Sequence, residues 1–153
     1  MTSSNWFFAL GLIVAALLTA ESVRQLRRRW VLVEIKGVSM EPALHDGDEV
    51  LAKRTRNIAV GDIVVVTAPD PRLGWAEAKR APSVKFASRG SAPSPWWVKR
   101  VTAGPGEPMP DSGEPVPPGH YFLLSDNPEV RDDSRRHGPC PANLIVGSVI
   151  RSF

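Results

Sequence analysis

The hydrophobic and polar positions divide the chain into an apolar N-terminal run and a longer part with short alternating segments. Residues 5–20 are apolar on every side of a helix and carry no charge. The segment 5–23 approaches the roughly 20 residues that a membrane-crossing helix needs, so we predict a membrane anchor helix there. A cleaved signal peptide is one alternative, but the four arginines between residues 24 and 29 follow the run instead of preceding it. A buried or surface-lying helix is the other alternative.

After residue 30 the pattern is typical of strands. Short stretches of β-branched residues are bounded by glycine, proline and aspartate, which predicts strands joined by turns. The expected strands cover residues 30–37, 48–54, 61–69, 94–107, 113–127 (centred on Tyr121 to Leu124) and 142–153. Residues 67–95 are rich in proline, alanine, serine and basic residues, and we predict a long exposed loop there. The sequence therefore predicts a mainly β, antiparallel, barrel-like domain over residues 31–153, preceded by the membrane helix.

Length and composition limit the possible functions. With 153 residues the chain has room for an anchor and one domain of about 100–150 residues. Its formal charge of +3 is small and the basic residues are scattered, so nucleic acid is not an expected partner. Cys140 is the single cysteine, which excludes an internal disulfide and a cysteine metal site of the usual spacing. We expect Cys140 to be a small side chain near the surface with no role.

One predicted strand places a charged residue on an apolar face. Side chains alternate along a strand, so Trp97, Lys99 and Val101 share one face, while Trp96, Val98 and Arg100 share the other. Either Lys99 or Arg100 must therefore lie against apolar surface. A lysine tolerates this better, because it can lose its proton and an arginine cannot. A buried lysine with a lowered pKa is a competent general base near neutral pH.

A serine in an unusual turn is the matching nucleophile. Ser39 lies between Gly37 and Pro42, just after the first predicted strand. A serine hydroxyl becomes nucleophilic when an adjacent base removes its proton, and lysine is one such base. The N–H of Ser39 is a candidate oxyanion donor. Turn serines are usually structural, however, and strand lysines usually extend to solvent, so alternation alone leaves both interpretations open.

Three motifs in order resemble the type I signal peptidases. They are GVSMEP (37–42), VKRV (98–101) and VPPGHYFLLSDN followed by DDSRRHGP (116–139), and the similarity covers roughly residues 31–153. The resemblance implies a Ser39 nucleophile, a Lys99 general base and an antiparallel β fold with a substrate groove to which Gly37 and Met40 belong. It also implies a supporting box that braces the catalytic strands, formed by Asp126, Asn127, Asp133, Ser134 and Arg135.

The same resemblance implies the substrates and the location. We expect cleavage of extended precursor proteins after small side chains at the first and third positions before the scissile bond. No metal and no cofactor are implied, and we expect a monomer attached to the lipid bilayer. Maturation of nickel-type superoxide dismutase, as in a branch of the family, is an alternative function. The resemblance places a single-pass catalytic domain outside the cytoplasm, whereas the arginine bias places it inside.

The chain departs from the family pattern at three positions. The glycine that usually precedes Asp126 is Ser125 here, and Gly37 replaces a serine that in some members completes the oxyanion hole. Arg131 stands where a serine usually hydrogen-bonds the catalytic lysine. These changes leave open a second alternative, an inactive, membrane-tethered peptide-binding module on the same fold.

Three smaller questions also stay open. His137, near Asp132 and Asp133, raises the alternative of a Ser-His-Asp triad, although we expect this histidine to be solvated. Trp96 and Trp97 could belong to the core or rest on lipid. We expect Asp133 to form a structural ion pair with Arg135 or Arg136.

Overall fold

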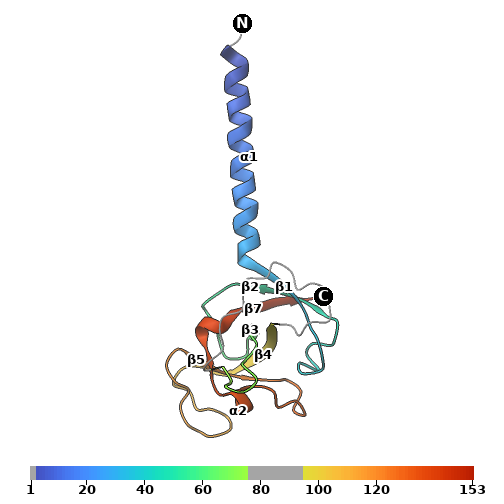
Figure 1. Ribbon diagram of the computed structural model, residues 1–153, viewed down its shortest axis with the longest axis vertical. Helices are drawn as coiled ribbons and strands as arrows, with labels where there is room; N and C mark the ends of the chain where they lie inside the picture. Colours follow the sequence, from blue (N-terminus) through green and yellow to red (C-terminus); the bar gives the residue numbers. More distant parts are fainter. Residues whose placement is uncertain (1–2, 76–94) are drawn as a thin grey trace. The chain divides into compact units, whose positions relative to one another are not determined.

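The computed structural model describes residues 3–75 and 95–153 (Figure 1). It separates the chain into two compact units, Met1–Trp30 and Val31–Phe153. We describe each unit by itself.

The first unit is the helix α1, which covers Ser3–Arg29 and includes the predicted helical segment 5–23. Its described apolar side chains are exposed; they are Leu10, Leu12, Ile13, Val14, Leu17, Leu18 and Val23. The hydroxyls of Thr19 and Ser22 donate hydrogen bonds back to helix carbonyls one turn earlier. Within the described part of the chain, no helix has both the length and the apolar character needed to cross a membrane. The helix is therefore confirmed, while its role as an anchor stays a prediction.

The second unit is mainly β, as predicted. Its described residues form a curled, half-barrel antiparallel sheet of seven strands, in the order β1-β2-β7-β3-β4-β5-β6 (Figure 1). The strands are β1 (Trp30–Glu34), β2 (Glu49–Lys53), β3 (Ile63–Thr67), β4 (Trp96–Ala103), β5 (His120–Leu124), β6 (Cys140–Pro141) and β7 (Ile145–Ser152). A short helix α2 (Ser134–His137) precedes β6, and the 3-10 turn η1 (Ala142–Leu144) follows it.

The central strands are buried on both faces. In β3, Val65 packs in one core cluster, while Val64 and Val66 pack in the other. In β4, Val98 belongs to the first cluster and Val101 to the second. A strand covered on both sides loses the polar positions of a half-exposed strand, which explains the continuous valine run in β3.

Two predictions about burial were wrong. Residue Trp75 lies in the predicted exposed loop 67–95, yet it is fully buried and its indole N–H donates to Thr67 O at 3.0 Å. The rest of that predicted loop, residues 76–94, lies outside the described residues. Cys140 is fully buried in the second core cluster instead of near the surface, because β6 pairs it with Tyr121 of β5 and its side chain packs in that cluster. Of the two alternatives for Trp96, the structure supports the core, because this side chain is buried in the first cluster.

Candidate active site

The site is built around Lys99 on the central strand β4. Lys99 pairs with Val64 on β3 and is only 3% exposed, whereas the Arg100 side chain is one-third exposed. The Lys99 Nζ atom lies 5.1 Å from the centre of the Trp97 ring, two residues earlier on the same face. The prediction that Lys99, and not Arg100, lies against apolar surface is confirmed.

Ser125 provides the polar contact of this buried amine. The Nζ atom of Lys99 donates a hydrogen bond of 2.8 Å to Ser125 Oγ. The antiparallel register explains the contact, because Arg100 pairs with Leu124 and the next pair along would be Lys99 with Ser125. Directly opposite residues point to the same face of a sheet. Sequence reasoning identified Ser125 only as a departure in a turn and missed this contact.

Burial and neighbouring charges set the protonation of Lys99. Burial lowers its pKa from the usual 10.5 to about 8; the negative charges of Asp133 and Asp132 oppose this decrease, and the positive charge of Arg135 adds to it. The amine is therefore partly neutral near pH 8, the state that a general base requires.

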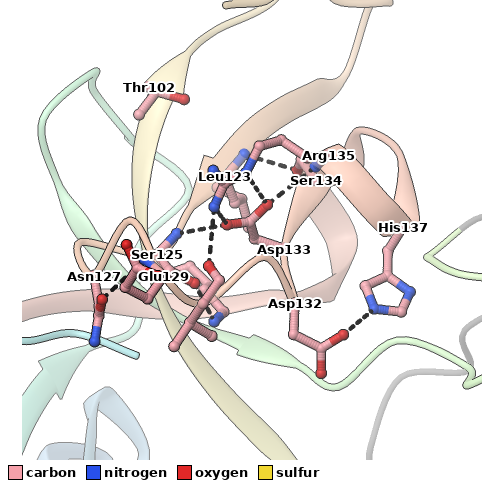
Figure 2. A network of polar contacts seen from close by, with 12 residues as sticks. Thr102, Leu123, Ser125, Asn127, Glu129, Asp132, Asp133, Ser134, Arg135 and His137 are labelled. Atoms are coloured by element: carbon pink, nitrogen blue, oxygen red, sulfur yellow. Dashed lines mark hydrogen bonds and ion pairs between the residues drawn. The ribbon is translucent and has the colours of Figure 1, made fainter. Parts of the chain in front are cut away.

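Asp133 organises the supporting box (Figure 2). Its fully buried carboxylate accepts hydrogen bonds from the Ser125 N–H at 3.0 Å and from the Arg135 side chain at 2.9 and 2.6 Å. It also accepts the Arg135 N–H and so caps the N-terminus of α2. Burial alone would raise the pKa of Asp133, but the hydrogen bonds from Arg135 and Ser125 outweigh it and hold the pKa below its usual range. The predicted ion pair with Arg135 is confirmed.

Ser134 and Asp126 complete the attachment of the box to the sheet. The Ser134 hydroxyl is buried and accepts the Leu123 N–H of β5 at 2.8 Å (Figure 2). Asp126 binds Arg100 of β4 through two hydrogen bonds of 2.6 Å each. Such two-point pairing fixes geometry as well as charge. The box therefore holds β4 and β5 in a defined register around Lys99.

Asn127 links this region to the turn that carries Ser39. Its backbone N–H donates to Ser39 O at 3.1 Å, and its side-chain amide donates to Val38 O at 3.0 Å. Ser39 and Lys99 form no direct hydrogen bond in the described structure, but both are held by the three-residue segment Ser125–Asn127. The structure thus attaches the two predicted catalytic residues to positions 125 and 127 of one segment.

The two predicted groove residues differ in environment. Gly37 is exposed and has a φ of +82°, a conformation that side chains rarely adopt, and its N–H donates to Asp46 at 2.6 Å. The requirement for glycine there is conformational. The Met40 side chain is fully buried in the first core cluster. Its side chain is therefore part of the core.

His137 is placed differently from what we expected. Its side chain is mostly buried, its Nε2 lies 2.9 Å from Asp132 (Figure 2), and its ring packs edge-on against Trp75 and Trp97. The prediction of a solvated histidine was wrong, because the two indole rings cover it. No hydrogen bond joins His137 to Ser39 among the described residues, and the Ser-His-Asp triad has no support.

Arg131, predicted to stand in place of the serine that binds the lysine, is exposed. The charges that act on Lys99 come from Asp133, Asp132 and Arg135. Arg131 is not among the groups that shift the pKa of Lys99.

Comparisons with known proteins agree with this architecture. The family model described as signal peptidase, peptidase S26, matches residues 4–109 and 108–153. The chain belongs to this signal peptidase family.

Individual relatives are processing enzymes of organelles. The chain is 35% identical over 137 residues to thylakoidal processing peptidase 1, chloroplastic, of Arabidopsis thaliana, covering 76% of this chain and 40% of that protein. It is 32% identical over 123 residues to human mitochondrial inner membrane protease subunit 1, covering 77% of this chain and 66% of the relative. The corresponding protein of Schizosaccharomyces pombe is 29% identical over 150 residues, covering 90% of this chain and 82% of the relative.

Proposed function

We propose that the protein is a serine endopeptidase that uses a Ser39–Lys99 dyad. The observation that carries the proposal is the segment Ser125–Asn127, which binds the Lys99 amine at one end and the Ser39 carbonyl at the other. A buried lysine with a pKa of about 8 has the chemistry of a general base, and a serine hydroxyl is the nucleophile that such a base activates. Family membership supports the same assignment.

The reaction follows from these roles. Neutral Lys99 takes the hydroxyl proton as Ser39 Oγ attacks the scissile carbonyl carbon. The resulting ammonium returns a proton to the leaving amine as the C–N bond breaks, and an acyl-enzyme forms. Water then attacks this ester with Lys99 again as base, which releases the acid product and regenerates the Ser39 hydroxyl.

The oxyanion must be stabilised by donors other than a side chain at position 37. We assign the Ser39 N–H to this role, with the Met40 N–H as the second candidate in the same turn. The two hydrogen bonds of Asn127 to carbonyls 38 and 39 support the assignment, since they fix the peptide planes that carry these N–H groups. Gly37 contributes the turn and no donor side chain.

The proposed substrates are precursor proteins that carry a signal peptide or a short N-terminal propeptide in extended form. The printed names of the relatives, a processing peptidase and inner membrane proteases, support this class. Maturation of nickel-type superoxide dismutase differs from it only in the substrate and stays a prediction. The chain spans 40% and 66% of the lengths of these two relatives.

We also propose that α1 attaches the protein to a membrane. The support comes from its exposed apolar side chains and from Thr19 and Ser22, whose hydroxyls are satisfied within the helix as lipid surroundings require. The side on which the catalytic domain lies is decided by C-terminal fusions to alkaline phosphatase and to a reporter active in the cytoplasm.

A serine-reactive activity probe tests the dyad. We expect the full chain to be labelled on Ser39, and Ser39→Ala and Lys99→Met to be unlabelled while still folded. Matched precursor peptides then report cleavage through the mass of the new N-terminus. Labelling of Lys99→Met at the unaltered rate would overturn the base assignment, and an unlabelled, folded full chain would favour the inactive peptide-binding module.

A further inference from the structure

We infer that Ser125 is the positioning residue of Lys99, the residue that aims its amine at the nucleophile. The inference deepens the proposed function and rests on it. The resemblance assigned this task to position 131, where the chain has an exposed arginine. The structure provides a hydroxyl from another position, Ser125, which directly follows β5 and accepts the hydrogen bond of Lys99 Nζ.

The residue that carries this hydroxyl is both buried and held by a backbone hydrogen bond. Ser125 is 8% exposed, and its N–H is bound to the Asp133 carboxylate at 3.0 Å. Asp133 is itself fully buried and is held by Arg135. A hydroxyl whose backbone is tied to a buried ion pair loses little further freedom when it binds an amine, which is the condition for orienting it.

The chemistry of the amine explains why one bond suffices. A neutral amine has two N–H groups and one lone pair. When one N–H donates to Ser125 Oγ, rotation about the Cε–Nζ bond is restricted. The lone pair can then point in only a few directions. Ser125 Oγ is the only hydrogen-bond partner of Nζ among the described residues, and the Trp97 ring lies along another side of the amine.

The hydrogen bond also affects the equilibrium between the two forms of Lys99. An ammonium donates a stronger hydrogen bond to a hydroxyl than a neutral amine does, so the Ser125 contact favours the charged form. Removing the hydroxyl should therefore lower the pH at which Lys99 titrates. A serine that only fills space would leave this titration unchanged.

The test measures Lys99 directly and catalysis separately. Carbon-13 NMR of the lysine Cε follows the titration of Lys99 in the full chain in detergent micelles, with its signal assigned by its loss in Lys99→Met. We expect Ser125→Ala to move the midpoint down by about one pH unit or less, and to reduce kcat by roughly 10- to 100-fold with KM within about twofold. Ser125→Thr, which keeps a hydroxyl, should recover most of the turnover, and Arg131→Ala should change neither quantity.

The outcomes separate this inference from the proposed function. Thermal unfolding checks that each variant folds, and Ser125→Cys, similar in size but a weak acceptor, replaces Ser125→Ala if that variant does not fold. An unchanged midpoint and unchanged kcat in the folded variant would overturn the role of Ser125, as would the same effects in Arg131→Ala. Full activity of Lys99→Met would instead overturn the dyad itself.

Discussion

Asn127 holds the turn of Ser39 through two donors, its backbone N–H to Ser39 O and its side-chain amide to Val38 O. Its side-chain oxygen in turn accepts the N–H of Glu129 at 3.0 Å (Figure 2). One residue thus connects the turn that follows β1 to the loop that follows β5. The turn of Ser39, the proposed nucleophile, is thus held by a residue 88 positions away in sequence.

Replacing Asn127 by aspartate should separate its role as donor to the Ser39 turn from its role as acceptor of the Glu129 N–H. The substitution keeps the oxygen that accepts Glu129 N–H but removes the donor to Val38 O and places a negative charge beside it. We expect a loss of about 1–2 kcal/mol in unfolding free energy and a fall of roughly tenfold in probe labelling of Ser39. Glu129→Ala, which keeps every backbone contact, is the control. Unaltered labelling of folded Asn127→Asp would show that the side-chain clamp is not needed for reactivity.

The lowered pKa of Lys99 predicts a pH dependence of both activity and stability. Activity should rise with pH through about 8 as the amine becomes neutral. Since the folded pKa lies below the usual 10.5, the unfolded chain binds more protons between these values. Stability should therefore increase from about pH 8 to 10.5 and be lowest, for this group, below pH 8.

Lys99→Met should remove the cost of burying the lysine charge. The methionine side chain is similar in length and needs no desolvation of charge, so we expect the variant to be more stable at pH 7 by about 1–3 kcal/mol, although inactive. Urea unfolding at pH 7 and pH 10 measures the difference, which should shrink at the higher pH. Lys53→Met, on an exposed strand position, is the control. A variant less stable than the parent at pH 7 would contradict the assigned burial penalty.

Asp133 should be the most sensitive acidic residue for stability. It is fully buried and its loss would leave the Arg135 guanidinium without its partner. We expect Asp133→Asn to cost about 3–5 kcal/mol, whereas Asp132→Asn, at a carboxylate that is 44% exposed, should cost under about 1 kcal/mol. Denaturant unfolding measures the loss of unfolding free energy in the two variants. Equal losses would show that Asp133 does not organise the supporting box.

The same carboxylate predicts part of the acid sensitivity. Because its pKa is held below the usual 3.8, Asp133 contributes stability above that value, and the contribution is lost as the pH falls toward the folded pKa. Asp133→Asn should therefore lose less stability than the parent between pH 5 and the acid limit of folding.

The sequence predicted six of the seven described strands and the burial of Lys99, because these depend on local alternation, and it missed the two-residue strand β6. Successive side chains of a strand point to opposite faces, so a stretch of four or five residues is enough to show that a charged residue lies on an apolar face. The Ser125 contact depends on the register between β4 and β5, which is set by turns and bulges between distant segments. The burial of Trp75 and Cys140 likewise depends on which elements cover them. Trp75 is a single large aromatic residue in a segment of small and polar residues, and this contrast could have indicated its burial.

His137 should be dispensable for the reaction despite its place near the site. Its contacts are with Asp132 and the rings of Trp75 and Trp97, which are structural roles. His137→Phe keeps the ring packing and removes the Asp132 contact, and we expect its kcat/KM to remain within about threefold of the parent. Lys99→Met is the inactive reference in the same assay. A loss of 100-fold or more in His137→Phe, with normal folding, would replace the lysine mechanism by one based on histidine.

The anchoring role of α1 is the last prediction. A charge placed among its exposed apolar side chains should prevent insertion, because a central arginine costs about 2.5–3.5 kcal/mol even on insertion scales. We expect the full chain to remain in the membrane pellet after an alkaline carbonate wash and Leu12→Arg together with Leu17→Arg to be released. Gln25→Arg, beyond the apolar run, is the matched control and should stay in the pellet. Release of the parent chain by the wash would exclude insertion and leave α1 as a helix that binds another apolar surface, while retention of the double variant would show that the catalytic unit attaches to the membrane without it.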